Sequence, residues 1–352
     1  MPYIATETHP RAALPAQTRR LQRTTRILLV AMLLGICFLD YWQYSRDSHS
    51  AEFMHSAKNW AAVAQGWGYA PQQYRIGIVQ SADWLARHTH LAPRHIFTLV
   101  DAGALFAGSL LLLGMVEKSR PYRQAALPAQ ALATLTTLFL LLYALLWLTW
   151  YQRAETLPSM LFVVLSCALW KRPEAAITSA KTIFIAIFLP LLALAEGWVR
   201  ADVACLLHLG FFLTCLPRRP QQIALSRRLA LCVSGAGMML PAAVQLYMMK
   251  IAWPHAVYAP DAPPFQLLLN FTFPSYLMVF TLYCLPFFWT LHKARRQWDT
   301  LHAPERGLLL ASALYLCLWL CVGMADEVRI FLPFAVAAIP LTTRFVLEEA
   351  GC

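Results

Sequence analysis

The stretch AQALATLTTLFLLLYALLWLTW, residues 129–150, decides the fold class of this chain. It runs for 22 residues without a charged side chain. A helix needs about 20 apolar residues to cross the ~30 Å hydrocarbon core of a bilayer, where it satisfies its own backbone hydrogen bonds. Residues 129–150 therefore predict a membrane-spanning helix.

Nine other apolar runs flank this stretch. Together they predict an all-α fold, a polytopic transmembrane bundle of about ten spans: 27–44, 96–116, 129–150, 157–170, 182–196, 203–216, 229–249, 272–291, 307–324 and 330–346. The fourth, fifth and sixth runs are short for a full crossing. We expect those three to be tilted, re-entrant or extended by polar residues that face protein.

The composition of the whole chain agrees with this prediction. Of its 352 residues, 59% are hydrophobic and 13% charged, whereas an average soluble domain is about a quarter charged. This excludes a water-soluble enzyme, a disordered chain and a secreted disulfide scaffold. Eight of the nine cysteines fall within or at the edges of the spans, which favours core packing over a disulfide framework or a zinc site.

The net charge of +11 carries topological information. With these spans, 20 basic residues fall on the side of the N-terminus and 9 on the opposite side. By the positive-inside rule, both termini are predicted to be cytoplasmic, in a bacterial inner membrane. The domains are then a basic cytoplasmic tail (1–26), one transmembrane domain (27–346) and a short cytoplasmic tail (347–352). The charge matches anionic membrane lipids rather than nucleic acid.

The predicted external loop 45–95 is the longest, and long loops are usually functional. Apolar residues recur at helical spacing over 53–64 and again over 78–85. Two short amphipathic helices at the membrane surface are therefore expected, and a role limited to capping the bundle remains an alternative.

Charged residues gather on the predicted outer side, at or near the ends of spans. Such charges are costly at membrane depth and usually face a bundle interior or a wet cavity. Arginine suits phosphate because its planar fork binds two oxygens. The candidates for a charged-substrate site are Asp40, Arg75, Glu155, Glu196, Arg200, Asp202, Asp326, Glu327 and Arg329.

Simpler interpretations of these residues stay open. Asp40 can be a hydrated helix end, and Arg200 and Asp202 can form a local ion pair. Asp326 and Glu327 can pair with Arg329 in a tight turn. Asp101, inside a span, is either functional or paired within the bundle.

Two segments carry a resemblance to a known family. The first span ends in Asp40 and leads into the long external loop, which contains QYRIGIV at 73–79. The last span opens with EVRIFLP at 327–333, a Glu-x-Arg followed by apolar residues and proline. In these features the chain resembles the GT-C class of integral-membrane glycosyltransferases.

The resemblance implies transfer of a sugar from a polyprenyl-phosphate donor to an acceptor on the external, periplasmic face. It implies that Arg75, Arg200 and Arg329 hold the donor phosphate and stabilise it as the leaving group. Asp40 is the first candidate for the catalytic base and Glu327 the second. The remaining substrate-binding candidates are Tyr74, Trp42 and Trp67, which can stack on sugars, and Glu196, Asp202 and Asp326.

The sequence departs from the family at one motif, because no Asp-x-Asp pair follows Asp40. A divalent metal is compatible with the outer acids, but no ligand motif supports it, so no cofactor is assigned. The expected partners are the lipid-linked sugar donor and membrane lipids, and no nucleic acid.

Four other functions stay open. A transporter or flippase of lipid-linked glycans predicts internal repeats. A membrane acyltransferase predicts an essential histidine, and a glycan polymerase predicts a large late loop rich in arginine. A noncatalytic assembly subunit predicts that the outer acids are dispensable.

Overall fold

A computed structural model describes residues 16–46, 60–150, 154–171, 179–217, 225–258 and 265–351. In these ranges the secondary structure is helical, apart from isolated bridges such as Ala70–Tyr258. The main helices are α1 (Ala16–Arg46), α3 (Gly77–Thr89), α4 (Pro93–Glu117), α5 (Arg120–Gln124), α6 (Leu127–Leu146), α7 (Thr156–Trp170), α8 (Ser179–Cys215), α9 (Arg227–Tyr247), α10 (Leu267–Thr272), α11 (Pro274–Arg296), α12 (Ala303–Val322) and α13 (Leu332–Glu349).

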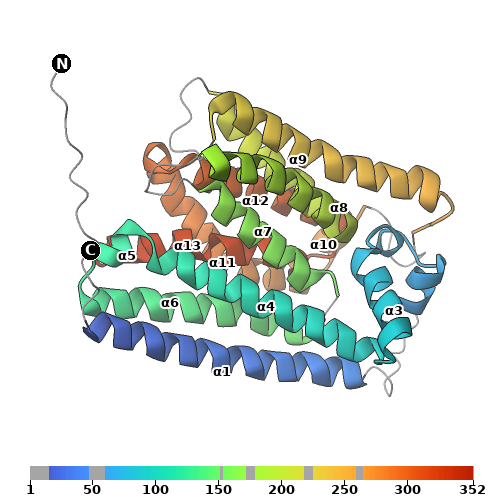
Figure 1. Cartoon of the computed structure of the whole chain (residues 1–352), viewed down its shortest axis with the longest axis horizontal. Helices are drawn as coiled ribbons and strands as arrows, with labels where there is room; N and C mark the ends of the chain where they lie inside the picture. Colours follow the sequence, from blue (N-terminus) through green and yellow to red (C-terminus); the bar gives the residue numbers. More distant parts are fainter. Residues whose placement is uncertain are drawn as a thin grey trace.

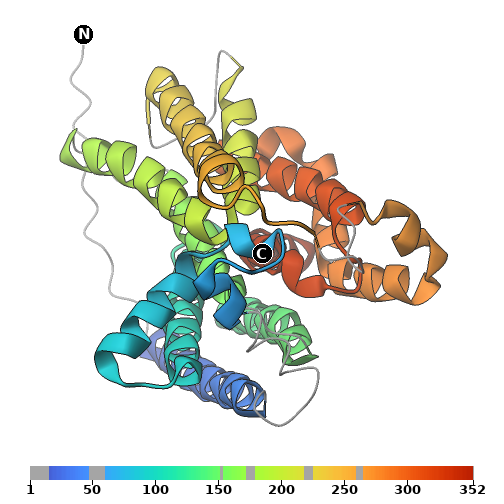
Figure 2. The same ribbon diagram turned by 90° about the vertical axis from the view of Figure 1, so that its right-hand side faces the viewer.

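The long helices lie alongside one another in a bundle (Figures 1 and 2). α7 and α13 are central: α13 packs against α4, α6, α7 and α11, and α7 packs against α4 and α8. α1 lies at one edge, against α4 and α6. Among the described residues, seven helices are long and apolar enough to cross a membrane, and the apolar helix α7 is shorter. The polytopic helical character predicted from the sequence is therefore confirmed.

Two of the predicted spans are joined in the structure. The runs 182–196 and 203–216 lie on two helical segments that follow each other directly within α8 (Ser179–Cys215) and meet at Arg200, whose backbone is non-helical (φ −150°, ψ 81°). The polar stretch 196–202 suggested a loop between spans. The break falls inside this stretch, at Arg200, and the charged side chains of the stretch have partners on α7 and α12.

The predicted external loop is partly described. Residues 60–65 are helical, and α3 covers the second expected amphipathic segment. Phe53 and Ala57, from the first segment, lie outside the described residues. Three-residue turns of 3₁₀ helix, η1 (Gln72–Tyr74) and η5 (Val328–Ile330), carry candidate site residues.

Glycines set the close approach of α8 to α12. A Cβ atom on Gly210 would lie 2.2 Å from the carbonyl oxygen of Gly307, and one on Gly307 would lie 2.6 Å from the Phe211 ring. Small residues at such crossings allow two backbones to pack directly. The crossing fixes the position of α12, which carries Tyr315, relative to Arg200 on α8.

We expect Gly210→Ala to destabilise the protein by about 1–3 kcal/mol, because the added methyl group meets backbone that cannot move aside without separating the helices. Gly103→Ala is the matched control, since a Cβ at Gly103 meets no atom within 4 Å. The control is expected to be neutral or slightly stabilising. Thermal unfolding in one detergent compares the two, and equal midpoints would refute the tight crossing.

Candidate functional site: an arginine–carboxylate network

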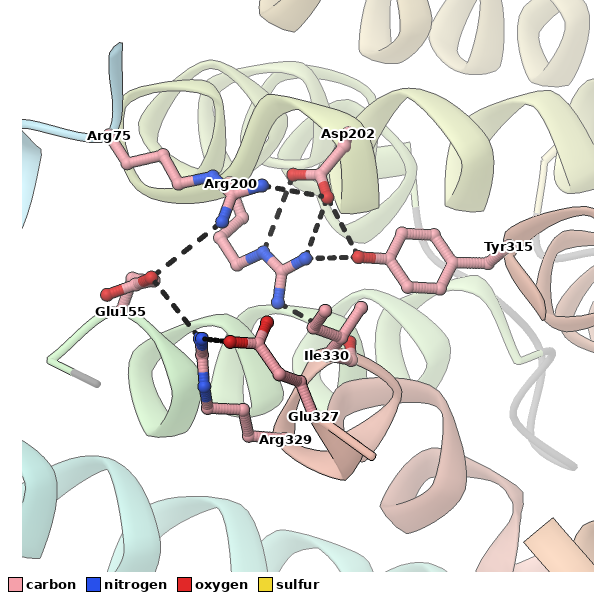
Figure 3. A network of polar contacts seen from close by, with 8 residues as sticks. All are labelled: Arg75, Glu155, Arg200, Asp202, Tyr315, Glu327, Arg329 and Ile330. Atoms are coloured by element: carbon pink, nitrogen blue, oxygen red, sulfur yellow. Dashed lines mark hydrogen bonds and ion pairs between the residues drawn. The ribbon is translucent and has the colours of Figure 1, made fainter. Parts of the chain in front are cut away.

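Six charged side chains from four parts of the chain meet at the end of the bundle that carries α3, away from the C-terminus (Figure 1). Arg75 follows η1, Glu155 precedes α7, and Arg200 and Asp202 sit at the kink of α8. Glu327 and Arg329 belong to the turn around η5. Figure 3 shows these side chains together with Tyr315 of α12.

Arg200 is the most enclosed member of the network, with 1% of its side chain exposed. Its Nη2 donates to Asp202 Oδ2 at 2.7 Å and to the Tyr315 hydroxyl. Its Nη1 donates to the Ile330 carbonyl at 3.4 Å. The kink lets one side chain tie α8 to α12 and η5 (Figure 3).

Asp202 collects several of these contacts. Besides Arg200, its Oδ2 accepts a hydrogen bond of 2.8 Å from the Tyr315 hydroxyl and lies 3.5 Å from Arg75 Nη2. The aspartate therefore links a helix-buried arginine to one that comes from the loop before α3.

Glu155 connects the other half of the network. Its Oε1 lies 3.8 Å from Arg75 Nη1 and 4.0 Å from Arg329 Nη1. Arg329 also contacts Glu327, with Nη2 3.0 Å from Oε1. Three arginines thus face three carboxylates, so the network is balanced in formal charge.

The members differ in their access to solvent. Arg200 and Arg329 are 1% and 6% exposed, whereas Arg75, Asp202 and Glu327 are 20%, 26% and 28% exposed. Arg75 lies 3.8 Å from Glu155 and 3.5 Å from Asp202, farther than Arg200 lies from Asp202 (2.7 Å). The buried Arg200 and Arg329 therefore connect the helices and turns of the site. Arg75, the most exposed of the three arginines, is the one best able to contact a ligand.

The segment before Arg75 is anchored by buried polar groups. Tyr74 is buried and donates a hydrogen bond of 3.2 Å to the Ala256 carbonyl, and burial raises the pKa of its hydroxyl. Gln73 is fully buried, accepts from Gly68 N–H and donates to the Val63 carbonyl. Tyr74 therefore positions Arg75 rather than offering an open ring face.

Other candidate residues lie outside the ion-pair network. Glu196 is fully buried one turn before Arg200, where its Oε1 accepts from Ser159 Oγ at 3.1 Å. Asp326 is half-buried in the turn before Glu327, and burial raises the pKa of its carboxyl. Trp42 and Trp67 are exposed at the surface.

Asp40 occupies a separate, mostly apolar pocket. Its side chain is buried between α1 and α4 beside Asp101, with Leu105 and Leu145 also lining the cavity. The structure therefore brings Arg75, Arg200, Asp202, Glu327 and Arg329 together, and it does not bring Asp40 into that group.

Sequence reasoning missed two residues that support the site, Tyr315 and Asn270, and it gave no partners for Glu155. Glu155 was noted as an outer acid, but only the fold shows that it bridges Arg75 and Arg329. Tyr315 lies within an apolar run of the sequence. Its hydroxyl is the one feature that could have indicated a polar contact there. Asn270, in the short helix α10, is separated in the sequence by 50 residues from Leu320, whose carbonyl it contacts.

Asn270 holds the turn that leads to Glu327. It is fully buried, and its Nδ2 donates to the carbonyls of Leu320 and Gly323 at 2.9 and 2.8 Å. Its Oδ1 accepts from Ala325 N–H at 2.8 Å. One amide thus clamps the end of α12 and the following turn onto α10.

Over the ranges that the structure describes, no group of three or more His, Cys, Asp or Glu side chains is arranged to hold a metal ion. Arginines alternate with the acids, and they compete with a cation for the same oxygens.

Comparison with known proteins gave no relative: no family model matches the chain, and no curated protein or solved structure is significantly similar to it.

Proposed function

We propose that this chain is an integral-membrane glycosyltransferase of the GT-C type, which uses a polyprenyl-phosphate-linked sugar as donor on the external face of a bacterial inner membrane. The observation that carries this proposal is the meeting of Arg75, Arg200 and Arg329 at one end of an apolar helical bundle (Figure 3). In a bound polyprenyl phosphate, the prenyl chain would lie against the apolar helices and the phosphate group would lie beside the arginines.

In the proposed reaction, an acceptor hydroxyl attacks the anomeric carbon of the sugar. The bond between that carbon and the phosphate oxygen breaks, and polyprenyl phosphate leaves. Arg75 contacts the phosphate and stabilises its developing charge, while Arg200 and Arg329 position the surrounding carboxylates. The proton of the hydroxyl passes to a carboxylate base.

Glu327 is the better placed of the two candidate bases. Its side chain belongs to the arginine–carboxylate network through Arg329 and is 28% exposed, so an acceptor can approach it. Asp40 lies in its own pocket and is the second candidate. If Glu327 is the base, Glu327→Gln abolishes transfer while binding of the lipid phosphate persists, and Asp40→Asn leaves transfer intact.

The proposed topology has ten crossings and cytoplasmic termini. α8 covers 37 residues, but its backbone is non-helical at Arg200, so it is not one straight helix across a ~30 Å bilayer core. Its kink at Arg200 divides it into two membrane segments, as the hydropathy pattern predicts. α7 and α13 supply the remaining crossings beside the long helices.

Arg75→Ala tests the proposal through binding of undecaprenyl phosphate to the full-length protein in nanodiscs. We expect the affinity to fall roughly 10- to 100-fold, because a charge-assisted contact to phosphate is lost. Arg87→Ala is the matched control, since Arg87 lies in the same predicted loop and, among the described residues, its ion pair is with Asp83 on the exposed surface of α3.

The expected result is weaker binding in Arg75→Ala and unchanged binding in Arg87→Ala. If Arg75→Ala and Arg87→Ala bound undecaprenyl phosphate with equal affinity, Arg75 would not be a phosphate-binding residue. Transport of a lipid-linked sugar without covalent transfer would favour a flippase instead.

A further inference from the structure

A second charged feature lies at the opposite end of the bundle, on the side of α1 that faces away from the other helices. One side of this helix is packed: Leu29, Leu33 and Ile36 are buried in the main core. On the opposite side, Ile27, Val30 and Leu34 are 61%, 39% and 57% exposed.

The exposed side of α1 changes from basic to apolar along its length. Arg19, Arg23 and Arg26 precede Ile27 and Val30 on one stripe, because residues three, four and seven apart share a helix face. The stripe from Arg19 to Val30 is about 16 Å long at 1.5 Å per residue. The residues Arg19, Gln22, Arg23, Arg26, Ile27 and Val30 line one open stretch of surface along it.

The arginines of this stripe differ in their partners. Arg26 Nη2 lies 3.1 Å from Glu117 Oε2 at the end of α4, which neutralises it and fixes its side chain. Within the described part of the chain, Arg19 and Arg23 form no ion pair, and both are exposed. Counting only the residues that the structure describes, two positive charges without an ion-pair partner therefore lie where α1 becomes apolar.

We infer that this stripe is a binding site for an anionic phospholipid. The phosphate lies against Arg19 and Arg23, and the acyl chains follow Ile27, Val30 and Leu34. A soluble anion satisfies only the basic part of the stripe, and a zwitterionic lipid satisfies only the apolar part. An anionic lipid matches both, and basic residues beside a membrane segment attract such lipids. This inference is independent of the proposed transferase site.

The test is retention of lipid by the full-length protein, measured by native mass spectrometry after exchange into detergent with added phosphatidylglycerol or phosphatidylcholine. In Arg19→Gln/Arg23→Gln we expect about tenfold less bound phosphatidylglycerol than in wild type, since each basic side chain near the surface contributes appreciably to binding. Phosphatidylcholine should bind wild type and variant alike.

Arg228→Gln is the control for general surface charge. Arg228 is exposed at the start of α9 and forms no ion pair in the described structure. An equal loss of phosphatidylglycerol in Arg228→Gln and the double variant would overturn the inference, because attraction would then be diffuse.

A second variant distinguishes a lipid from a free anion. Ile27→Asn/Val30→Asn keeps every arginine but removes the apolar half of the stripe, so it is also expected to lose phosphatidylglycerol. Retention unchanged in this variant, or complete displacement by inorganic phosphate, would show an anion site without lipid specificity. Thermal unfolding of each variant confirms that it is folded.

Discussion

Arg200→Ala is expected to lower the free energy of unfolding by about 3–5 kcal/mol, which is the cost of removing one partner from a buried ion pair. The truncation leaves Asp202, the Tyr315 hydroxyl and the Ile330 carbonyl without their shared donor. Chemical denaturation of the purified protein in detergent measures the loss. The effect is large because Arg200 is 1% exposed, so water cannot replace the lost contacts.

Arg87→Ala provides the contrast. Arg87 pairs with Asp83 one turn away on an exposed helix face, and such surface pairs contribute about 0–1 kcal/mol. Arg200→Lys keeps the charge but cannot reproduce a fork that reaches three acceptors, and it should rescue only part of the stability. If Arg200→Ala cost no more than Arg87→Ala, the network would not hold α8, α12 and η5 together.

Asn270→Ala is expected to cost about 3 kcal/mol, because it leaves one buried N–H and two backbone carbonyls short of hydrogen bonds. Its effect should be local as well as global. The amide of Ala325 loses its acceptor, so hydrogen exchange should quicken over residues 323–331. Under the proposed function, lipid-phosphate binding should weaken less than in Arg75→Ala, since Asn270 acts only through the turn that carries Glu327 and Arg329.

Thr272→Ala is the control for this prediction. Thr272 is exposed on the same short helix, and its hydroxyl donates to the Leu268 carbonyl of that helix. Its substitution should change stability by less than about 0.5 kcal/mol. Unchanged exchange at residues 323–331 in Asn270→Ala would mean that the turn is held by other contacts.

Much of the candidate site was predictable as a set of residue types. Charges at the ends of apolar spans indicate a functional or paired cluster because of their cost in lipid. Arg75, Arg200, Asp202, Glu327 and Arg329 were identified in this way, and they do meet. Asp40 has the same signature, yet it lies beside Asp101 in another pocket.

The two residues that the sequence did not reveal were missed for the same reason. Tyr315 and Asn270 are neutral, and they sit in apolar surroundings where hydropathy reports only a helix. Arg200 reaches Tyr315 across 115 residues, and Arg75 reaches Asp202 across 127. No local spacing in the chain encodes such contacts.

The sequence by itself determined that this is a polytopic helical membrane protein with an uneven distribution of basic charge. That conclusion depends on the transfer of side chains and backbone between water and lipid, which is a property of composition and segment length. The tertiary structure alone decided which charges become partners. Partnership depends on how each helix is rotated and how closely it packs, and contacts such as Gly210 against Gly307 set both. Hydropathy locates a helix along the chain, but it does not fix which neighbour each of its faces meets.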